Sequence, residues 1–296
     1  MANDFWKRKI IINPQAGGGR ARKLFPLLRE KLLKRGLSFH LQFSESGEHV
    51  TELVRHALRE GYDQIVSCGG DGTAHRVIQP IVGGRAVLAL IPLGRGNDLC
   101  RDLGIGGDID AACDLLQHGK VRKIDVIQVD SGPYLMGVGG VGFDSEVNAL
   151  SDRLRRFLGE KAGYLLPVLL KTLTYRTKQV DLQANGDSRR GPMLLVAFGN
   201  TRSCGMGMQI TPLSEPDDGL LDVCWIDPVK KLRLLCFFPT VFSGEHLDLE
   251  EVHYFQADAV RVESPVPMNL YGDGEFLGRT PFTLRVRPQA LRVLVP

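Results

Sequence analysis

The stretch QIVSCGGDGT, residues 64–73, joins a short apolar run to three glycines, one aspartate and one threonine. It precedes AHRVIQPIV, residues 74–82, so the glycines lie between an expected strand and an expected helix. A plain turn needs fewer glycines. Glycines at such a turn let backbone N–H groups approach a ligand with no β-carbon in the way. The start of the following helix favours anions, above all phosphates.

Asp71, in the middle of this turn, indicates what kind of anion would bind. A carboxylate is unfavourable beside a bare anion. It is favourable beside an anion that carries Mg²⁺, which takes carboxylate ligands directly or through water. GGDGT therefore predicts a turn that binds a polyphosphate with its magnesium ion. The alternative interpretation is a structural glycine-rich loop.

Two more apolar runs end in similar chemistry. IPLGRGNDLCR, residues 91–101, follows the apolar run AVLALI and places Asn97 and Asp98 after two glycines. NPQAGGGRAR, residues 13–22, follows KIII and holds three glycines and two arginines. One such loop would be weak evidence. Three loops at consecutive strand ends predict a phosphate site at the edge where a parallel sheet binds its ligands.

The first 125 residues alternate strand and helix patterns. Leucines spaced along residues 23–35 and apolar residues spaced along residues 49–60 predict two amphipathic helices. Residues 37–43 alternate as a strand does, and the runs at 64–68 and 86–91 are typical of strands buried on both faces. This order predicts a doubly wound α/β domain over residues 1–125, with a parallel sheet and helices on both sides.

Short strand patterns dominate after residue 125. They lie at 123–129, 179–185, 193–200, 220–226, 259–264, 267–273 and 282–288, with helical stretches near 145–176 and 229–242. We expect a second, mainly antiparallel β-sandwich domain over residues 126–296. Packing of its last few residues on the first domain is left open.

The composition narrows the class of protein. Hydrophobic residues make up 43% and charged residues 24% of 296 residues, as in ordinary globular chains. Six cysteines, at 68, 100, 113, 204, 224 and 236, form no C-x-x-C pair and suit reduced residues of a cytoplasmic protein. The apolar stretches at 164–173 and 232–242 are shorter than the roughly 20 residues of a spanning helix. No membrane crossing is expected.

The formal net charge of +3 says little about partners, but the placement of the cations says more. Basic residues surround the apolar stretch at 164–173; they are Arg153, Arg155, Arg156, Lys161, Lys171, Arg176 and Lys178. One interpretation is a solvated face, and the other is a surface that docks on anionic lipid headgroups. Nucleic acid is not an expected partner, because no basic stripe with interleaved aromatic residues is present.

The motifs together resemble the diacylglycerol kinase catalytic-domain superfamily of lipid kinases, in particular its soluble bacterial branch. The matching motifs are Asn13-Pro14, GGDGT at 69–73, Pro92-Leu93-Gly94 with Gly96-Asn97-Asp98, DGLLD at 218–222 and Asp273-Gly274-Glu275. The resemblance implies an active site in the cleft between an α/β nucleotide domain and a β-sandwich domain. It implies Mg²⁺-dependent transfer of the ATP γ-phosphoryl group to a lipid hydroxyl, with diacylglycerol giving phosphatidic acid as the favoured reaction.

The resemblance also implies roles for single residues. It places nucleotide contacts on Asn13, Ser44, Gly69, Gly70, Asp71, Gly72, Thr73, Arg95, Gly96 and Asn97. It places magnesium and its waters on Asp71, Asp98 and Asp125, and a structural Mg²⁺ on the Asp218 carboxylate and the carbonyls of Glu215 and Leu220. Glu275 is the implied general base, and Asp71 is the other implied catalytic residue.

Some residues depart from the family pattern and leave alternatives open. Arg95 stands where the family has Thr or Ser, and His75-Arg76 replaces its Asn-Glu. GGDGT also occurs in NAD kinases, so a NAD kinase-like enzyme is one alternative. A catalytically silent lipid-binding regulatory protein is another, and a sphingosine-type substrate is a third. The expected location is cytoplasmic and peripheral to a membrane, and a homodimer is left open.

The segment GVGGVG, residues 137–142, matches the glycine pattern of dinucleotide-binding turns. That interpretation needs a βαβ unit and a later acidic residue, and neither is evident. The resemblance instead makes GVGFD, residues 140–144, a turn of the second domain with Asp144 near the cleft.

Overall fold

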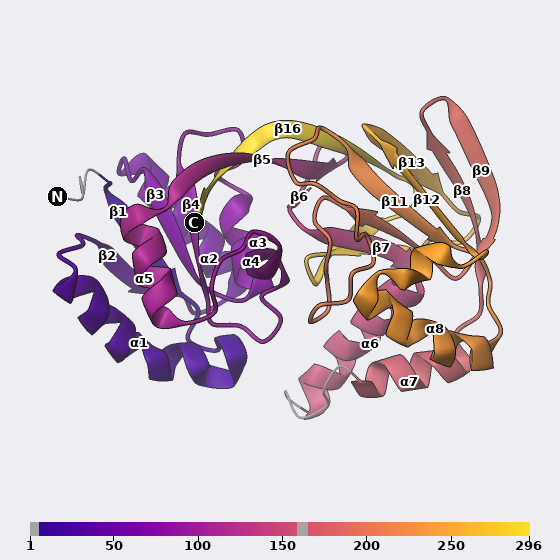
Figure 1. Ribbon diagram of the computed structural model, residues 1–296, viewed down its shortest axis with the longest axis horizontal. Coiled ribbons are helices and arrows are strands. Elements are labelled where there is room, and N and C mark those ends of the chain that lie inside the picture. Colours follow the sequence, from indigo (N-terminus) through magenta and orange to yellow (C-terminus); the bar gives the residue numbers. More distant parts are fainter. Residues whose placement is uncertain (1–5, 159–164) are drawn as a thin grey trace. The chain divides into compact units, whose positions relative to one another are not determined.

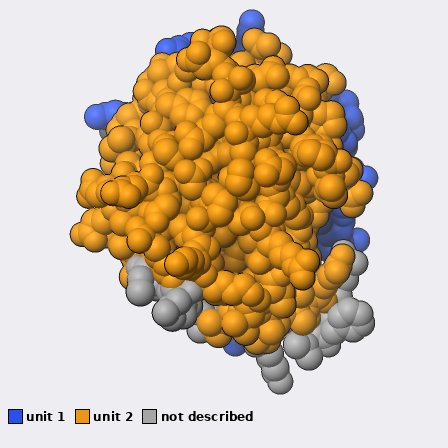
Figure 2. Space-filling model, turned by 90° about the vertical axis from the view of Figure 1, so that its right-hand side faces the viewer, with its two compact units in different colours: residues 1–126, 288–296 blue, residues 127–287 orange. Residues whose placement is uncertain are grey.

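The computed structural model describes residues 6–158 and 165–296, without the side chains of 155–158, 165, 232, 235 and 236. Arg155, Arg156, Lys161 and Cys236, named above, therefore have side chains outside the described part. The chain divides into two compact units, coloured separately in Figure 2. Unit 1 comprises residues 1–126 and 288–296, and unit 2 comprises residues 127–287.

Unit 1 alternates strands and helices along the chain (Figure 1). Its elements are β1 (Arg8–Ile12), α1 (Ala16–Lys34), β2 (His40–Phe43), α2 (Gly47–Arg59), β3 (Gln64–Gly69), α3 (Asp71–Ile78), β4 (Val87–Pro92), α4 (Asp98–Asp102), α5 (Ile109–His118) and most of β5 (Lys120–Val129).

The unit 1 sheet is parallel, with strand order β2–β1–β3–β4. Residues Arg292 and Val293, near the end of the chain, pair with β4 as a further parallel strand. Right-handed connections put α1 on one face and α2 and α3 on the other. Consistently, α2 packs with α3, and α1 packs with α5. The predicted doubly wound α/β fold is confirmed.

The ends of α1 and β2 differ from the sequence prediction. Gly17, Gly18 and Gly19 have φ angles of 63°, 69° and 87°, so the first turn of α1 is left-handed and the regular helix begins after it. The strand predicted from residue 37 begins only at residue 40. The reason is that the Leu37 N–H donates to the Leu32 carbonyl and so belongs to the end of the helix.

Unit 2 is mainly antiparallel. Its elements are β6 (Tyr134–Leu135), β7 (Val138–Gly142), α6 (Phe143–Leu158), α7 (Leu165–Thr174), β8 (Lys178–Ala184), β9 (Asp187–Met193), β10 (Leu195–Gly199), β11 (Leu221–Ile226), α8 (Lys231–Ser243), a 3₁₀ helix (Glu245–Asp248), β12 (Val252–Ala257), β13 (Ala259–Glu263), β14 (Asn269–Gly272), β15 (Glu275–Arg279) and most of β16 (Phe282–Val295). One of its sheets runs β12–β11–β10–β7–β14–β15, and the other runs β16–β13–β8–β9.

The six-stranded sheet is buried on both faces. Along β10, Val196 and Phe198 point into the core shared with the second sheet. The alternate residues Leu195 and Ala197 point into a core shared with α6, α7 and α8. A strand with two apolar faces reads as a continuous apolar run. The predicted antiparallel β-sheet domain is confirmed, with a helical layer on one side (Figure 1).

The segment GVGGVG forms β7, between β10 and β14 in that sheet. An added β-carbon would lie 2.8 Å from the Tyr271 carbonyl oxygen at Gly139 and 3.1 Å from the Val196 carbonyl oxygen at Gly140. The glycines therefore serve close strand packing. Gly142 has a φ of 102°, and α6 begins at the next residue, so the chain turns there without a loop.

Among the described helices, none is both long and apolar enough to cross a bilayer.

Candidate active site

The three glycine turns of unit 1 lie at one edge of the sheet, because β1, β3 and β4 are parallel neighbours. The turns contact one another through backbone. A β-carbon added to Gly70 would lie 3.1 Å from the Gly94 Cα, and one added to Gly17 would lie 2.5 Å from the Leu93 carbonyl oxygen. The N–H groups of Leu93 and Gly94 both donate to the Gly69 carbonyl, at 2.8 and 3.0 Å.

Side chains tie the first two turns together. The Asn13 amide nitrogen donates to the Thr73 hydroxyl at 3.1 Å, and the Asn13 amide oxygen accepts the Gln15 N–H at 3.0 Å. The Thr73 hydroxyl lies over Gly69, where a β-carbon would collide with it. Glycine is thus required at position 69 by close packing, a reason that the sequence alone could not give.

The first turn of α3 begins directly in the GGDGT motif. Gly70 is the N-cap and supplies no side-chain cap, while Asp71 and Gly72 are half-buried first-turn residues. Across from them, Asn97 adopts a left-handed conformation with a φ of 51°. Its amide bonds the Gly94 N–H at 3.0 Å and the Gly94 carbonyl at 3.1 Å, which closes the second turn.

Asp71 and Asp98 converge on Gly96. A β-carbon added to Gly96 would lie 3.1 Å from the Oδ2 atom of each carboxylate. Asp71 accepts the Leu99 N–H through Oδ1 at 3.3 Å, and Asp98 is bound by the Arg101 guanidinium. Glycine at position 96 therefore leaves room beside two carboxylates that face the same point.

This pair of carboxylates fits the chemistry of magnesium. Among residues 6–158 and 165–296, no group of three or more His, Cys, Asp or Glu side chains is placed to hold a metal ion. Mg²⁺ in phosphate-transferring sites is usually held by one or two carboxylates, with waters and the substrate's phosphates completing its shell. Asp71 and Asp98 can supply that share of the ligands.

Two other predicted nucleotide residues, and one of the residues that depart from the family pattern, have defined settings. Arg95 is exposed at the tip of the second turn. Ser44 is buried after β2, where its hydroxyl donates to the Ile12 carbonyl at 3.3 Å. His75 is 4% exposed and lies within 3.3 Å of the Gln79 amide nitrogen, so it is a core residue of α3.

Asp125 is fully buried within β5. Its Oδ1 atom accepts the Gln289 N–H at 2.6 Å, which fixes the carboxylate to the last strand of the chain. A role for Asp125 at the metal remains a prediction.

The Asp-Gly-Glu motif of unit 2 is a two-residue hairpin between β14 and β15, with Gly272 paired to Glu275. Asp273 and Gly274 have φ angles of 52° and 80°, as a type I′ turn requires. The Asp273 carboxylate accepts the N–H groups of Met136 and Gly137 at 3.0 and 2.8 Å. Glu275 is half-buried at the first position of β15. Asp273 therefore anchors the turn that precedes Glu275 to the backbone of residues 136 and 137. The sequence analysis did not predict this role of Asp273.

The acidic loop before β11 lies elsewhere in unit 2. Asp218 accepts the Leu220 N–H at 2.9 Å and the Gln256 amide at 3.2 Å, and Glu215 pairs with Arg202. Asp222, just beyond the loop, is 1% exposed. Burial raises the pKa of Asp222, and the neighbouring Asp218 carboxylate raises it further. The loop thus places the Asp218 carboxylate close to the buried Asp222 carboxyl.

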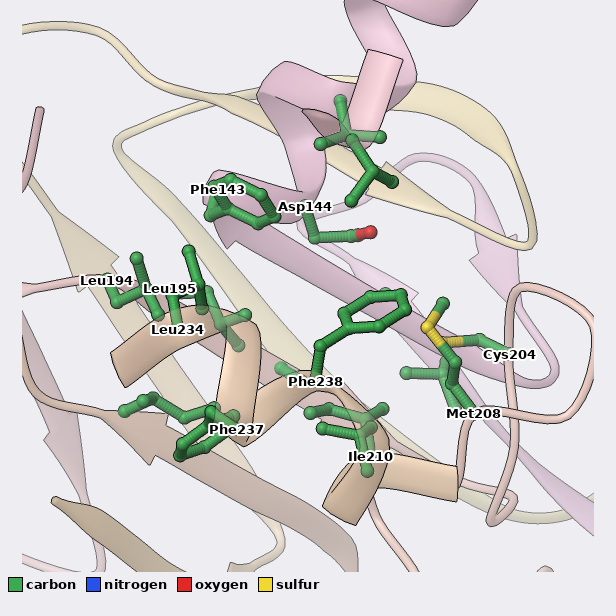
Figure 3. A pocket seen from close by; sticks show the side chains of 17 residues that line it. Phe143, Asp144, Leu194, Leu195, Cys204, Met208, Ile210, Leu234, Phe237 and Phe238 are labelled. Carbon is green, nitrogen blue, oxygen red and sulfur yellow. The ribbon is translucent and has the colours of Figure 1, made fainter. Parts of the chain in front are cut away.

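Unit 2 also contains an apolar pocket between the six-stranded sheet and its helices (Figure 3). It holds about 680 Å³ of space free of protein atoms, part of it open to solvent. Apolar side chains from β7, β10, β11, α6, α7 and α8 line it, and the rings of Phe143, Phe237 and Phe238 are prominent. Asp144 supplies the one carboxylate among the lining residues, and it accepts the Asn148 amide at 3.2 Å.

Sequence comparison finds a matching family model for each of the two units. Residues 7–129 match the family model described as "Diacylglycerol kinase catalytic domain", and residues 137–295 match "YegS C-terminal NAD kinase beta sandwich-like domain". A curated diacylglycerol kinase of Mycobacterium tuberculosis is 33% identical over 300 residues, which cover 99% of this chain and 96% of that protein. A diacylglycerol kinase of Bacillus subtilis is 28% identical over 93% of this chain and 91% of that protein.

Two solved structures of Bacillus anthracis proteins share the fold. Their TM-scores are 0.82 and 0.76 at 23% and 20% identity, with coverage of 98% or more of this chain and 97% of theirs. From the family models and the full-length relatives, the chain belongs to the diacylglycerol kinase catalytic-domain family and is an enzyme of the lipid kinase class.

Proposed function

We propose that this enzyme transfers the γ-phosphoryl group of ATP to the hydroxyl of a diacylglycerol-like lipid, giving a phosphatidic acid. The relatives are named diacylglycerol kinases. The observation that carries the lipid as substrate is the apolar pocket of unit 2, with its single carboxylate at Asp144. An acyl chain needs apolar walls, and ligand pockets are lined mainly by apolar and aromatic side chains with a few polar groups.

In unit 1 the glycine turns would bind the nucleotide. Backbone N–H groups at the first turn of α3, together with Arg95, suit the phosphates. Asp71 and Asp98 would hold the Mg²⁺ of the nucleotide, which supplies charge neutralisation during phosphoryl transfer. Asn13 and Thr73 would keep the turns in register through their hydrogen bond.

In unit 2, Glu275 would accept the proton of the lipid hydroxyl. The hydrogen bonds of Asp273 fix the turn just before Glu275, which suits a general base that must be held in position. The acyl chains would occupy the apolar walls of the pocket.

The other candidate functions have less support. NAD is highly polar, and a NAD kinase-like enzyme gives no reason for the apolar pocket. A silent regulatory protein gives no reason for Asp71 and Asp98 to converge on the gap at Gly96. A sphingosine-type lipid would also use an apolar pocket, so diacylglycerol and sphingosine are to be distinguished by assay. We further propose a cytoplasmic enzyme that meets its substrate at the membrane surface.

A pocket-filling substitution tests the lipid assignment. Val241 is 6% exposed on α8 and lines the pocket. Val241→Phe is expected to raise the KM for long-chain diacylglycerol by about tenfold, since losing the space for one methylene group in an apolar pocket typically costs about 1–3 kcal/mol of binding. Val241→Ala, which enlarges the same pocket, is the matched control and should not exclude the lipid. Steady-state kinetics would contradict the assignment if Val241→Phe left the lipid KM unchanged.

We propose in addition that Asp218, with the carbonyls of Glu215 and Leu220, binds a structural Mg²⁺. Added Mg²⁺ without ATP should then raise the unfolding free energy by roughly 2.7 kcal/mol at 100-fold saturation. Asp218→Ala should abolish this gain. Thermal unfolding at increasing Mg²⁺ concentrations measures it, with Asp187→Ala on the exposed β9 as the control. An unchanged magnesium response in Asp218→Ala would remove this metal site.

A further inference from the structure

A second pocket of unit 2, here called the hairpin pocket, lies between α6 and the hairpin of β14 and β15. It holds about 800 Å³ of space free of protein atoms, part of it open to solvent. Ala149, Asp152 and Arg153 line it from α6, and their spacing of three and four residues puts them on one face of that helix. The described lining residues include none of those assigned above to ATP, magnesium or the lipid.

The hairpin supplies two aromatic rings to this pocket. Tyr271 on β14 and Phe276 on β15 are a cross-strand pair, and their rings meet edge to face with centroids 5.7 Å apart. Tyr271 is 7% exposed, and its hydroxyl donates to the Asp152 carboxylate at 3.3 Å. Phe276 is 52% exposed. A buried ring that is bonded to α6 thus supports an exposed ring at the pocket.

Two arginines give the hairpin pocket a positive charge. Arg153 and Arg279 are exposed, and Asp152 is the one carboxylate among the described lining residues. The Arg279 Nε–H donates to the Asn269 amide oxygen at 3.0 Å, which orients the guanidinium and leaves its terminal nitrogens for another partner. Within the described part of the chain neither arginine forms an ion pair, whereas other arginines of unit 2 pair with carboxylates.

These groups together suit a water-soluble phosphate that carries a flat ring. Arginine is the side chain best matched to phosphate, and planar bases stack on aromatic side chains. A carboxylate accepts hydrogen bonds from ribose hydroxyls in nucleotide sites. Polar side chains make up most of the described lining, so a long acyl chain would find no continuous apolar wall here.

We propose that the hairpin pocket is a second nucleotide site, in addition to the glycine turns of unit 1. Arg153 and Arg279 bind the phosphate, and the base stacks on Phe276. Asp152 accepts a hydrogen bond from the ribose. The base would then rest on the hairpin that carries Glu275, the residue directly before Phe276.

The two sites differ in their need for magnesium. The hairpin pocket offers a single carboxylate, Asp152, which already accepts the Tyr271 hydroxyl. At the glycine turns Asp71 and Asp98 both face the space at Gly96. Nucleotide binding in the hairpin pocket should therefore persist without Mg²⁺, whereas binding at the glycine turns should depend on it.

The test is calorimetric titration of the full chain with adenosine monophosphate (AMP) in EDTA, which removes Mg²⁺. The wild type should bind one AMP per chain. Phe276→Ser should weaken this binding by at least about tenfold, because stacking on an aromatic side chain is lost. The matched control is Phe242→Ser, at a phenylalanine that is 44% exposed on α8, and it should bind AMP as the wild type does.

No AMP binding by the wild type, or equal binding by Phe276→Ser and the wild type, would overturn the proposal. Thermal unfolding checks that the variants are folded. Arg279→Gln alone provides the same test if Phe276→Ser is unstable.

The arginines have their own prediction. Arg153→Gln with Arg279→Gln should weaken AMP binding by at least about tenfold, because charged hydrogen bonds to the phosphate are lost. Binding of adenosine, which has no phosphate, should not change. Arg285→Gln, at an exposed arginine of β16, is the control. Equal weakening for AMP and adenosine would contradict the phosphate role, and inorganic phosphate that bound as tightly as AMP would overturn the nucleotide assignment.

The Asp71→Asn variant separates this proposal from the proposed function. It should lose Mg²⁺-dependent ATP binding and still bind AMP in EDTA as the wild type does. Loss of AMP binding in Asp71→Asn would place the AMP at the glycine turns and overturn the second site. If the wild type phosphorylates no lipid, the proposed function fails, and AMP binding by Phe276→Ser still decides the hairpin pocket.

Discussion

Asp71→Asn is expected to lower kcat/KM by about 10²–10³ and to weaken Mg²⁺-dependent ATP binding at the same time. Asparagine keeps the size of the side chain and an oxygen that can accept the Leu99 N–H, which Asp71 now accepts at 3.3 Å. It removes the negative charge beside Gly96, where Asp98 is the other carboxylate. Calorimetry with and without Mg²⁺ measures the binding, and a phosphate-transfer assay measures the rate.

The control is Asp102→Asn. It also removes one negative charge, but at the C-terminal end of α4, whereas Asp98 stands at the N-terminal end of that helix. ATP binding by Asp102→Asn should depend on Mg²⁺ as it does in the wild type. If Asp71→Asn also retained its magnesium dependence, the metal would have to be held by other residues.

Glu275→Gln is expected to lower kcat by about 10²–10⁴, the usual contribution of a general base. Glutamine preserves the shape at the start of β15 but does not accept a proton at neutral pH. The turn itself should persist, because Asp273 still accepts the N–H groups of Met136 and Gly137. ATP affinity should barely change, since the proposed role is at the lipid hydroxyl.

Glu263→Gln, at the end of β13 where the carboxylate pairs with Arg261, is the matched control and should leave kcat unchanged. Full turnover by Glu275→Gln on a lipid that the wild type phosphorylates would reduce the Asp-Gly-Glu motif to a hairpin turn. The base would then have to be sought among Asp71, Asp98 and Asp125.

The sequence was sufficient to predict features that depend on local order. Continuous apolar runs identified β3 and β4, because strands buried on both faces leave no polar alternation. The convergence of the glycine turns followed from the same assignment, since parallel strands end at one edge of their sheet. The gathering of Gly17, Gly70 and Gly94 agrees with it.

Features that depend on distant partners were not predictable. Strand β9, with the sequence DSRRGPM, has no strand pattern of its own and forms by pairing with β8 at the edge of its sheet. An edge position tolerates Pro192, whose missing N–H costs no ladder bond there. The glycines of β7 likewise resembled a ligand-binding turn, because only the neighbouring strands reveal that they serve close packing.

The site shows the same division. The motifs were sufficient to predict Asp71 and Asp98 as site residues. Only the structure shows that both carboxylates lie beside the space at Gly96. The pocket combines segments near residues 138–147, 194–210 and 234–241, which no local pattern connects. Glu146 lies far along the chain from Lys171 and Lys178, so the cation cluster seen in the sequence gave no sign of their pairing.

The most direct measurement of the central claim is transfer of labelled γ-phosphate from ATP by the full chain, with diacylglycerol, sphingosine and NAD offered as separate acceptors. The account predicts Mg²⁺-dependent formation of labelled phosphatidic acid, one molecule for each ADP released. It also predicts no labelled product from NAD. Labelled product from NAD alone, or no lipid product while ATP is bound with Mg²⁺, would contradict a lipid kinase built on these turns and this pocket.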